Sequence, residues 1–458
     1  VAGWQLDLTL LHANLDNGYD AFAIDNSFVT LSDRPGRDAQ RSTGAALDLR
    51  REPGRGPQLR SITAWADTRL EASFDGDWGN DRDWGEAGPY DFFSRTVRDR
   101  RTLSQDLRLS GAAGRLDWIV GAYGLRLEED NAQDDDGNYL GDVFGRSFDS
   151  RYRATSSALY GQADWALGAV TTLTSGLRLG QRASRYRGSD GAAFAPRDRM
   201  WGGQVTLTRA LGVDASGWLS VSRGFRAGGF NIGAAIPAER QQFDPEYAIA
   251  VEAGLRGRWD GAGLAADLAL FHLRRERQQV ATSFQLDPQD PLTFVYYTDN
   301  AARGRATGLE GSLRWQASDR WQLAATLSLM DSEHLGYRYG ERDLDGRGWA
   351  HAPRYQYSLA VTWRHPAGWM ARADLGGQDG FYFDSSHDQR SRPHELVNLR
   401  AGYEAVRWSA HAWVRNLLDE RYAVRGFYFG NEPPDFAETL YLRLGDPRQA
   451  GITVNVRL

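Results

Sequence analysis

Apolar and polar residues alternate with a period of two over much of the chain. The clearest run, 355–364, has a large apolar or aromatic residue at each odd position and a small or polar residue at each even one. The same pattern occupies 321–329 and 452–458. Because successive side chains of a β-strand point to opposite faces, this pattern predicts strands with one apolar and one polar face.

About eighteen such segments follow one another along the chain. We predict strands near residues 4–13, 40–51, 58–73, 95–110, 116–129, 152–166, 170–186, 199–210, 217–226, 246–258, 264–281, 302–316, 321–333, 354–364, 369–383, 394–405, 408–420 and 451–458.

The segments that connect these strands alternate between two kinds. Short polar turns form one set, for example 112–115, 259–263 and 366–368. Long segments rich in Asp, Gly and aromatic residues form the other, for example 75–91, 131–149 and 331–353. This asymmetry is typical of outer-membrane barrels, which have short periplasmic turns and long extracellular loops. A soluble two-sheet sandwich has no reason to keep it, so we predict an all-β fold, a transmembrane antiparallel β-barrel.

Composition agrees with this prediction. Hydrophobic residues make up 41% of the chain, and no apolar run approaches the roughly 20 residues that a membrane helix needs. The 16 Trp, 19 Tyr and 19 Phe could supply the aromatic girdles of a barrel. The net charge of -6 argues against nucleic-acid binding, and the absence of Cys excludes disulfides and thiolate metal sites.

Four motifs in the second half of the chain resemble those of TonB-dependent receptors. The segment 221–231, which reads VSRGFRAGGFN, resembles their mid-barrel signature, and FDPE at 243–246 with EAG at 252–254 resembles the element that opens the next strand. The segment 300–311 resembles N-x-G-x-A-x-x-x-G-x-E, and 414–423 resembles a penultimate-strand "NLFDExY" motif. Residues 1–220 match more loosely.

The resemblance implies a receptor that imports a scarce, bulky ligand, such as a ferric siderophore, using TonB and the proton-motive force. Such a receptor makes and breaks no covalent bond, so it is not an enzyme and needs no cofactor. Its implied partners are outer-membrane lipid, TonB and a small-molecule ligand that could be an iron chelate. Its implied location is the bacterial outer membrane.

The chain begins at Val1 in the middle of an alternating pattern, and it shows no signal peptide. Plugged transporter barrels have 22 strands, so we expect about four strands, a plug domain and a TonB box to precede Val1. Residues 1–458 would then be an incomplete barrel domain with an open seam between its first and last strands. The chain also ends at Leu458, where the resemblance leads us to expect an aromatic residue.

We interpret most of the motif residues as structural. These residues are Gly224, Gly228, Gly229, Pro245, Glu246, Gly308, Glu310, Asn416, Asp419 and Tyr422. The glycines of the first motif should permit a bend or a close approach of chains where strand meets loop. Asn416 and Asp419 should hydrogen-bond backbone near the extracellular rim.

Candidates for ligand contact are Arg226 and Asn231 in the first motif, and Trp78 and Trp84 in the loop 75–91. That loop is rich in Asp and could face a ligand or bind a cation, or it could be a solvated loop whose aromatic rings lie at the membrane interface. The acidic run 134–136 lacks the 12-residue pattern of a calcium-binding loop, so we expect it to be solvated.

No phosphate-binding loop, G-x-S-x-G or H-E-x-x-H motif occurs. His334, His351 and His387 fall in predicted long loops, which raises the question of haem. Haem receptors of this family carry "FRAP … NPNL", however, and the corresponding residues 225–228 read FRAG. The alternative to active uptake is a passive, plugless channel, and an outer-membrane hydrolase would need a catalytic constellation that the sequence does not offer.

Overall fold

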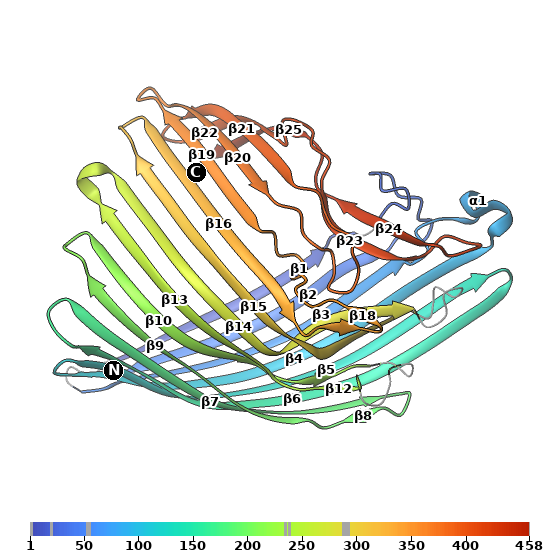
Figure 1. Cartoon of the computed structure of the whole chain (residues 1–458), viewed down its shortest axis with the longest axis horizontal. Helices are drawn as coiled ribbons and strands as arrows, with labels where there is room; N and C mark the ends of the chain where they lie inside the picture. Colours follow the sequence, from blue (N-terminus) through green and yellow to red (C-terminus); the bar gives the residue numbers. More distant parts are fainter. Residues whose placement is uncertain are drawn as a thin grey trace.

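The computed structural model describes residues 3–18, 22–51, 56–232, 236, 240–285 and 294–457. Val1 and Leu458, the two chain ends about which the sequence raised expectations, lie outside the described residues. The described chain forms one large, strongly curved antiparallel sheet that wraps around a central space (Figure 1). None of the helices among the described residues is long and apolar enough to cross a membrane.

The sheet contains nineteen strands, and eighteen of them are long because β8 has only two residues. They are β1 (Trp4–Asp16), β2 (Arg37–Arg51), β3 (Gln58–Asp75), β4 (Tyr90–Ala113), β5 (Leu116–Tyr139), β6 (Asp142–Ala166), β7 (Thr171–Gly188), β8 (Ala193–Phe194), β9 (Arg197–Ala210), β10 (Ala215–Arg226), β13 (Glu246–Trp259), β14 (Leu264–Gln285), β15 (Phe294–Gln316), β16 (Trp321–Leu335), β19 (Tyr355–Arg364), β20 (Trp369–Gln378), β21 (His394–Glu404), β22 (Trp408–Arg415) and β25 (Gln449–Val456).

Smaller elements lie in the connections. These are α1 (Asp81–Trp84), η1 (Gly85–Ala87), η3 (Asp260–Ala262) and three two-stranded hairpins: β11 (Gly229–Phe230) with β12 (Gln242–Phe243), β17 (Arg338–Tyr339) with β18 (Arg342–Asp343), and β23 (Ala423–Gly430) with β24 (Glu438–Leu444).

Each long strand pairs with the next long strand along the chain, from β1–β2 to β22–β25. No pairing joins β1 to β25 among the described residues, so the sheet has two free edges and an open seam. The prediction of about eighteen antiparallel strands with a seam between the first and the last is therefore confirmed.

The two faces of the sheet differ in polarity as predicted. Tyr355, Leu359 and Val361 are 37–47% exposed, so the alternating apolar face does not pack into a two-sheet core. On the opposite face, ion pairs line the wall of the central space. Asp48, for example, accepts hydrogen bonds from Arg50 (2.7 Å) and Arg60 (2.6 Å). An apolar outer face and a polar inner face are what a barrel in lipid requires.

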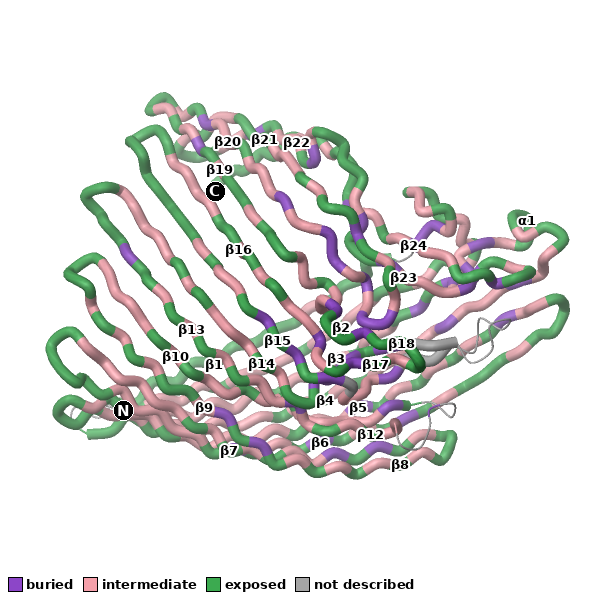
Figure 2. The backbone as a smooth tube through the Cα atoms, viewed as in Figure 1, coloured by how far each residue is buried: buried purple, intermediate pink, exposed green. Residues whose placement is uncertain are grey.

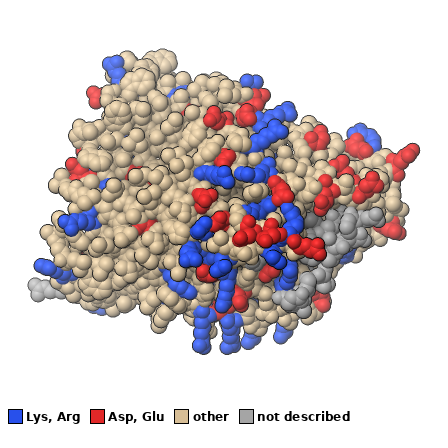
Figure 3. All heavy atoms as spheres, in the orientation of Figure 1, with Lys and Arg blue, Asp and Glu red and all other residues tan. Residues whose placement is uncertain are grey.

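Exposed Trp side chains gather at one end of the barrel. Six of them lie at strand ends beside the short turns, and Trp4 lies at the start of β1, on the same end; the six are Trp165, Trp259, Trp315, Trp321, Trp369 and Trp408. Amphipathic indole rings favour the interface between lipid and water, so these residues mark the periplasmic girdle. Charged side chains gather toward the opposite end, where the long connections lie (Figure 3).

Several predicted boundaries are wrong, including the start of the strand predicted at 302–316, which begins at Phe294. Residues 131–149 are not an irregular loop, because β5 and β6 pair as far as Tyr139 and Asp142. Here the paired strands extend beyond the part of the barrel whose outer face is apolar. Their side chains, such as Asp134 opposite Arg95 on β4, are mostly polar on both faces and so do not show the period of two. The predicted strands 369–383 and 408–420 end earlier, at Gln378 and Arg415.

Candidate functional site

The hairpin β23–β24 lies across the end of the barrel that carries the long connections (Figure 1). It belongs to the connection between the last two strands, yet it contacts the connections that follow β1 and β3. Asn26 donates a hydrogen bond from Nδ2 to the Leu440 carbonyl (3.0 Å) and accepts one from the Leu442 amide. Asn431 donates to the Asp77 carbonyl (3.1 Å). The hairpin therefore ties the two halves of the open barrel together at its mouth.

Aromatic rings fill the junction between the hairpin and these connections. Trp78 stacks on Phe22 with ring centroids 4.9 Å apart, and it meets Phe429 and Tyr441 edge to face at 5.6 and 5.2 Å. Tyr441 is fully buried. Buried stretches gather in this part of the molecule (Figure 2). The position of Trp78 shows how the loops are joined, and its role in ligand contact remains a prediction.

A cavity of about 410 Å³ opens beside the hairpin. Its wall is formed by the outer ends of β14 and β16, the connections 336–354 and 379–393, and β23. The polar groups that line it include Arg275, His334, His351, Asp384, His387 and Arg425, and the aromatic ones include Trp349, Phe427 and Tyr428. Three histidines from three separate segments of the sequence thus meet in one cavity.

Several of these side chains are held firmly. The Arg275 guanidinium bonds Glu246 of β13 and lies 5.2 Å from the centre of the Trp349 ring. His334 lies beyond Leu329, the last exposed apolar residue of β16, and is only 1% exposed. Its Nδ1 lies 3.1 Å from Oε1 of Gln278, whereas its Nε2 has no hydrogen-bond partner among the described residues.

Burial, together with the charges of Arg275 and Arg347, lowers the pKa of His334 to about 4. The imidazole is therefore neutral near pH 7. Because an amide oxygen can only accept, Nδ1 carries the hydrogen and Nε2 presents a lone pair. His334 can thus accept a hydrogen bond from a ligand or donate its lone pair to a metal.

The connection 379–393 supplies a carboxylate and an imidazole that contact each other. The Asp384 carboxylate accepts hydrogen bonds from the His387 ring (2.9 Å) and from the Ser386 and His387 amides (both 2.7 Å). Burial by itself raises the pKa of Asp384, but these bonds outweigh burial and hold the pKa at about 2. The connection is therefore built around an ionised carboxylate.

The predicted contact residues Arg226 and Asn231 lie near the cavity-forming segments but differ in environment. Arg226 ends β10 and is exposed, opposite Glu246 in the strand register. Asn231 is 8% exposed, and its amide bonds the Arg240 carbonyl and both backbone groups of Thr298. Asn231 therefore fixes the connection after β10 to β15. Neither residue lines the cavity.

Trp84 lies in the connection between β3 and β4. Its indole Nε1 donates to Oδ2 of Asp77 (3.3 Å), and its ring lies 5.7 Å from that of Tyr90. The structure thus places Trp84 against the acidic residues of its own loop, away from the cavity.

The glycines of the first motif differ in their surroundings. A Cβ at Gly228 would lie 2.4 Å from the Phe243 carbonyl oxygen and 3.1 Å from the nitrogen of Pro245, and one at Gly229 would lie 2.5 Å from the Phe243 ring. Gly224, by contrast, has open space around it. The close approach at Gly228 and Gly229 brings the segment before β13 against the end of β10.

Glu246 is the motif residue most directly linked to the cavity. It is 5% exposed, and it accepts hydrogen bonds from Arg275 and from the Gln279 amide (2.8 Å). Arg277, between these two partners, has φ 53°, where the β14–β15 register shifts. Glu246 therefore holds an irregular stretch of β14 in place and orients Arg275.

The third motif lies on β15. A Cβ at Gly308 would lie 2.5 Å from both the Leu329 carbonyl oxygen and the Phe271 ring, so the position requires glycine. Glu310 is exposed, opposite Ala269 and Ser328 in the register. Both residues lie within the barrel wall.

The last motif forms a tight backbone turn. Asn416 has φ 48°, is 4% exposed, and bonds the backbone of Glu420 (2.9 Å) and the Asp446 carbonyl (3.1 Å). Asp419 accepts from the Arg448 amide (2.9 Å). Tyr422 stacks on His394 at 4.5 Å. These contacts anchor both ends of the connection that carries β23–β24.

Sequence reasoning did not find Arg275, Asp384 or Arg425. No local pattern distinguishes them from other charged residues in polar segments, and their proximity depends on contacts between distant loops. The loop histidines were noticed, but nothing in the sequence showed that they share one cavity.

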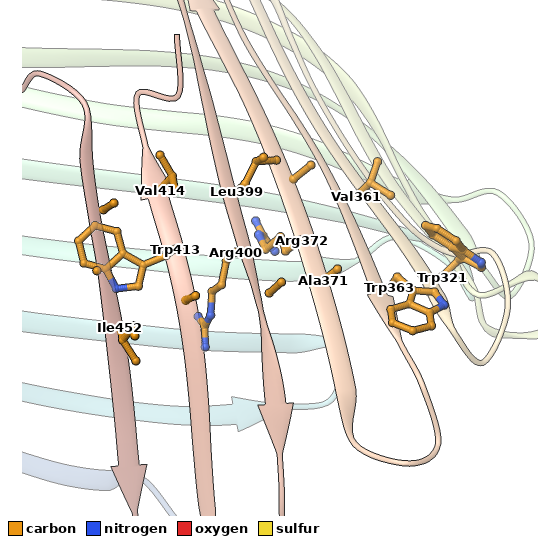
Figure 4. A pocket seen from close by; sticks show the side chains of 15 residues that line it. Trp321, Val361, Trp363, Ala371, Arg372, Leu399, Arg400, Trp413, Val414 and Ile452 are labelled. Carbon is orange, nitrogen blue, oxygen red and sulfur yellow. The ribbon is translucent and has the colours of Figure 1, made fainter. Parts of the chain in front are cut away.

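A larger depression of about 890 Å³ lies on the wall formed by β16, β19–β22 and β25 (Figure 4). Its lining is mostly apolar or small and includes Trp321, Val361, Leu399 and Ile452, all of them exposed. This surface belongs to the apolar outer face, so it suits acyl chains better than a polar ligand.

Comparison with known proteins gives a consistent result. The family described as TonB dependent receptor-like, beta-barrel, matches residues 3–417. The chain is 26% identical over 191 residues to the metal-pseudopaline receptor CntO of Pseudomonas aeruginosa (strain UCBPP-PA14). That alignment covers 40% of this chain and only 25% of the relative.

Solved structures of outer-membrane receptors share the fold, and two of them illustrate it. The ferric yersiniabactin uptake receptor FyuA from Yersinia pestis superposes with a TM-score of 0.80 at 18% identity, covering 99% of this chain and 68% of that one. The siderophore receptor PiuA from Acinetobacter baumannii gives 0.74 at 16% identity, covering 99% and 71%. The chain thus belongs to the TonB-dependent receptor β-barrel family and is a protein of the bacterial outer membrane.

Proposed function

We propose that this chain is the barrel of an active-transport receptor that imports a bulky metal chelate, such as a ferric siderophore, with energy supplied through TonB. The observation that carries the proposal is the cavity beside β23–β24, where Arg275, Arg425 and three histidines converge. Ferric chelates present anionic oxygens, which charge-assisted hydrogen bonds from Arg recognise strongly. Related receptors named for metal or siderophore uptake support the ligand class.

In this proposal the plug and the TonB box belong to a part of the protein that precedes Val1. The ligand would bind between the outer loops and the plug, and TonB would then displace the plug. The barrel itself makes no covalent bond with the ligand. The exposed guanidinium of Arg425, which lies over the Phe427 ring at 4.8 Å, would contribute directly to ligand affinity.

The test is binding of radioactive ferric complexes of a catecholate, a hydroxamate and citrate to the purified protein in detergent. We expect one class to bind, and Arg425→Ala to weaken its binding by about tenfold or more, because one charge-assisted hydrogen bond contributes about 1.5–3 kcal/mol. Arg115→Ala is the matched control, since Arg115 lies at a short turn on the opposite end of the barrel. If none of the three classes binds, or if both variants bind like the wild type, the proposed site is wrong.

A further inference from the structure

Three aspartates meet where the connection between β3 and β4 begins and ends. Asp75 is the last residue of β3, Asp77 lies in the connection, and Asp91 is the second residue of β4. One carboxylate oxygen from each lies within 4.8 Å of the other two. Oxygens bound to a common Ca²⁺ at 2.3–2.6 Å are at most about 5 Å apart, so this spacing suits a single shared ion.

Two of the three carboxylates are buried, Asp91 is partly buried, and the cluster is incompletely paired. Asp75 is 0% exposed and Asp77 is 1% exposed. Oδ1 of Asp75 and Oδ1 of Asp91 are both buried and have no hydrogen-bond partner among the described residues. A buried carboxylate oxygen without a partner is costly, so these two atoms point to a ligand that supplies positive charge.

Among the described residues, one guanidinium forms an ion pair with the cluster, and it is shared. The Arg34 guanidinium bonds Oδ2 of Asp91 (3.0 Å) and also Asp136 of the β5–β6 hairpin. Asp33 lies close to the cluster, and burial together with the charges of Asp75 and Asp81 raises the pKa of its carboxyl group. The cluster thus has three carboxylates and one guanidinium, which contacts only Asp91 among them and is shared with Asp136.

Protons can balance part of this charge. Burial, together with the neighbouring Asp75, raises the pKa of Asp77 to about 9. A proton and a cation therefore compete for the same oxygens, as they do at any carboxylate metal site.

The surrounding backbone holds the carboxylates in position. The Gly76 amide donates to the Phe92 carbonyl (2.6 Å), which fixes the chain between Asp75 and Asp77. Oδ1 of Asp77 accepts from the Gly79 amide and Oδ2 accepts from Trp84 Nε1, both at 3.3 Å. These contacts orient the carboxylate, as outer-shell hydrogen bonds do at metal sites.

We propose that Asp75, Asp77 and Asp91 form a calcium site in the extracellular connection between β3 and β4. Oxygen-only, carboxylate-rich ligands select a hard divalent cation, and Mg²⁺ dehydrates less readily than Ca²⁺. Asn431 of the hairpin loop bonds the Asp77 carbonyl, so the ion stabilises the junction between this connection and β23–β24. Calcium thereby orders the mouth of the barrel beside the cavity.

The structure offers a specific optical probe of this site. The Trp84 indole lies within hydrogen-bond distance of Asp77, so excitation of Trp84 should sensitise the luminescence of Tb³⁺ bound by the three carboxylates. In the purified protein we expect saturable Tb³⁺ emission that Ca²⁺ displaces and that Mg²⁺ displaces only at much higher concentration. Trp84→Phe should lower the emission, and it should still give heat of Ca²⁺ binding in calorimetry, with an affinity reduced by about tenfold or more because the variant also removes an outer-shell hydrogen bond to Asp77.

Substitution of the ligands tests the assignment. Asp77→Asn and Asp91→Asn should each weaken Ca²⁺ binding by about tenfold or more, because even outer-shell changes weaken metal sites 10–100-fold. Asp142→Asn is the matched control, an exposed aspartate at the tip of the β5–β6 hairpin.

Two results would overturn the proposal: no Ca²⁺-displaceable emission and no heat of Ca²⁺ binding in the wild type, or equal weakening by Asp142→Asn. If Asp77→Asn does not fold, the wild-type and Trp84→Phe measurements decide the question, since neither alters a ligand. Loss of ferric-chelate binding with Ca²⁺ binding intact would contradict only the proposed function.

Discussion

Replacement of Asn431 by alanine should loosen the mouth of the barrel at two places that are distant in the sequence. The side chain is 2% exposed and makes three hydrogen bonds: to the Gly76 carbonyl (3.3 Å), to the Asp77 carbonyl (3.1 Å) and from the Tyr90 hydroxyl (3.1 Å). At about 1 kcal/mol of net stabilisation each, their loss amounts to about 3 kcal/mol. This corresponds to roughly a hundredfold increase in the population of the locally opened state.

Amide hydrogen exchange followed by mass spectrometry measures that population directly. In Asn431→Ala we expect exchange to accelerate by up to about a hundredfold both in the hairpin 423–444 and in the connection 76–90. The transmembrane strands should be unaffected, because their ladder does not involve Asn431.

Asn138→Ala provides the control, because Oδ1 of Asn138 accepts only a local bond, from the Gly141 amide in the same hairpin (3.0 Å). Its effect should stay within the β5–β6 tip. Acceleration in the hairpin 423–444 of Asn431→Ala, with unchanged exchange in 76–90, would refute the conclusion that Asn431 joins the two segments.

Three further predictions follow from the strands and loops. Because the chain contains no Cys, single cysteines can be placed at 358–361 and spin-labelled in lipid vesicles. Labels at Leu359 and Val361 should be highly accessible to oxygen. Labels at Ser358 and Ala360 should be highly accessible to a water-soluble nickel complex. A uniform profile would contradict the outward orientation of the odd residues. Gly308→Ala should lower the free energy of unfolding in urea by about 1–3 kcal/mol, because the added Cβ would overlap the Leu329 carbonyl. Gly311→Ala, whose added Cβ would have its nearest contact at 3.5 Å, should change it by less than about 0.5 kcal/mol. Asp384, whose pKa is held at about 2 in the folded protein, stabilises its loop above the unfolded pKa of about 3.9, and this contribution is lost as pH falls toward 2. Pepsin should therefore cleave 379–393 progressively faster between about pH 4 and pH 2 in the wild type, with a weaker pH dependence in Asp384→Asn.

The strands could be predicted because lipid imposes a period of two on each of them. The run 355–364 shows this most clearly, and the observed strand β19 (Tyr355–Arg364) differs by one residue from the prediction. Where the paired strands extend beyond the lipid-facing part of the barrel, the period of two is no longer required. The paired residues 131–139 and 142–149 were therefore predicted as a loop.

The cavity and the acidic cluster could not be predicted, because both depend on contacts between connections. Asn431 and Asp77 are 354 residues apart, and no local rule relates them. The loop 75–91 did suggest a cation site through its composition, but the third carboxylate, Asp91, became evident only through the pairing of β3 with β4. Asn416 ended β22 earlier than predicted because its left-handed conformation breaks the strand.

Energy-dependent uptake tests the central claim most directly. Cells that produce this protein should be given the radioactive ferric chelate that the purified protein binds, in paired strains with and without TonB. The account predicts accumulation that requires both the protein and TonB. Equal accumulation in the two strains would contradict it and would identify the barrel as a passive channel.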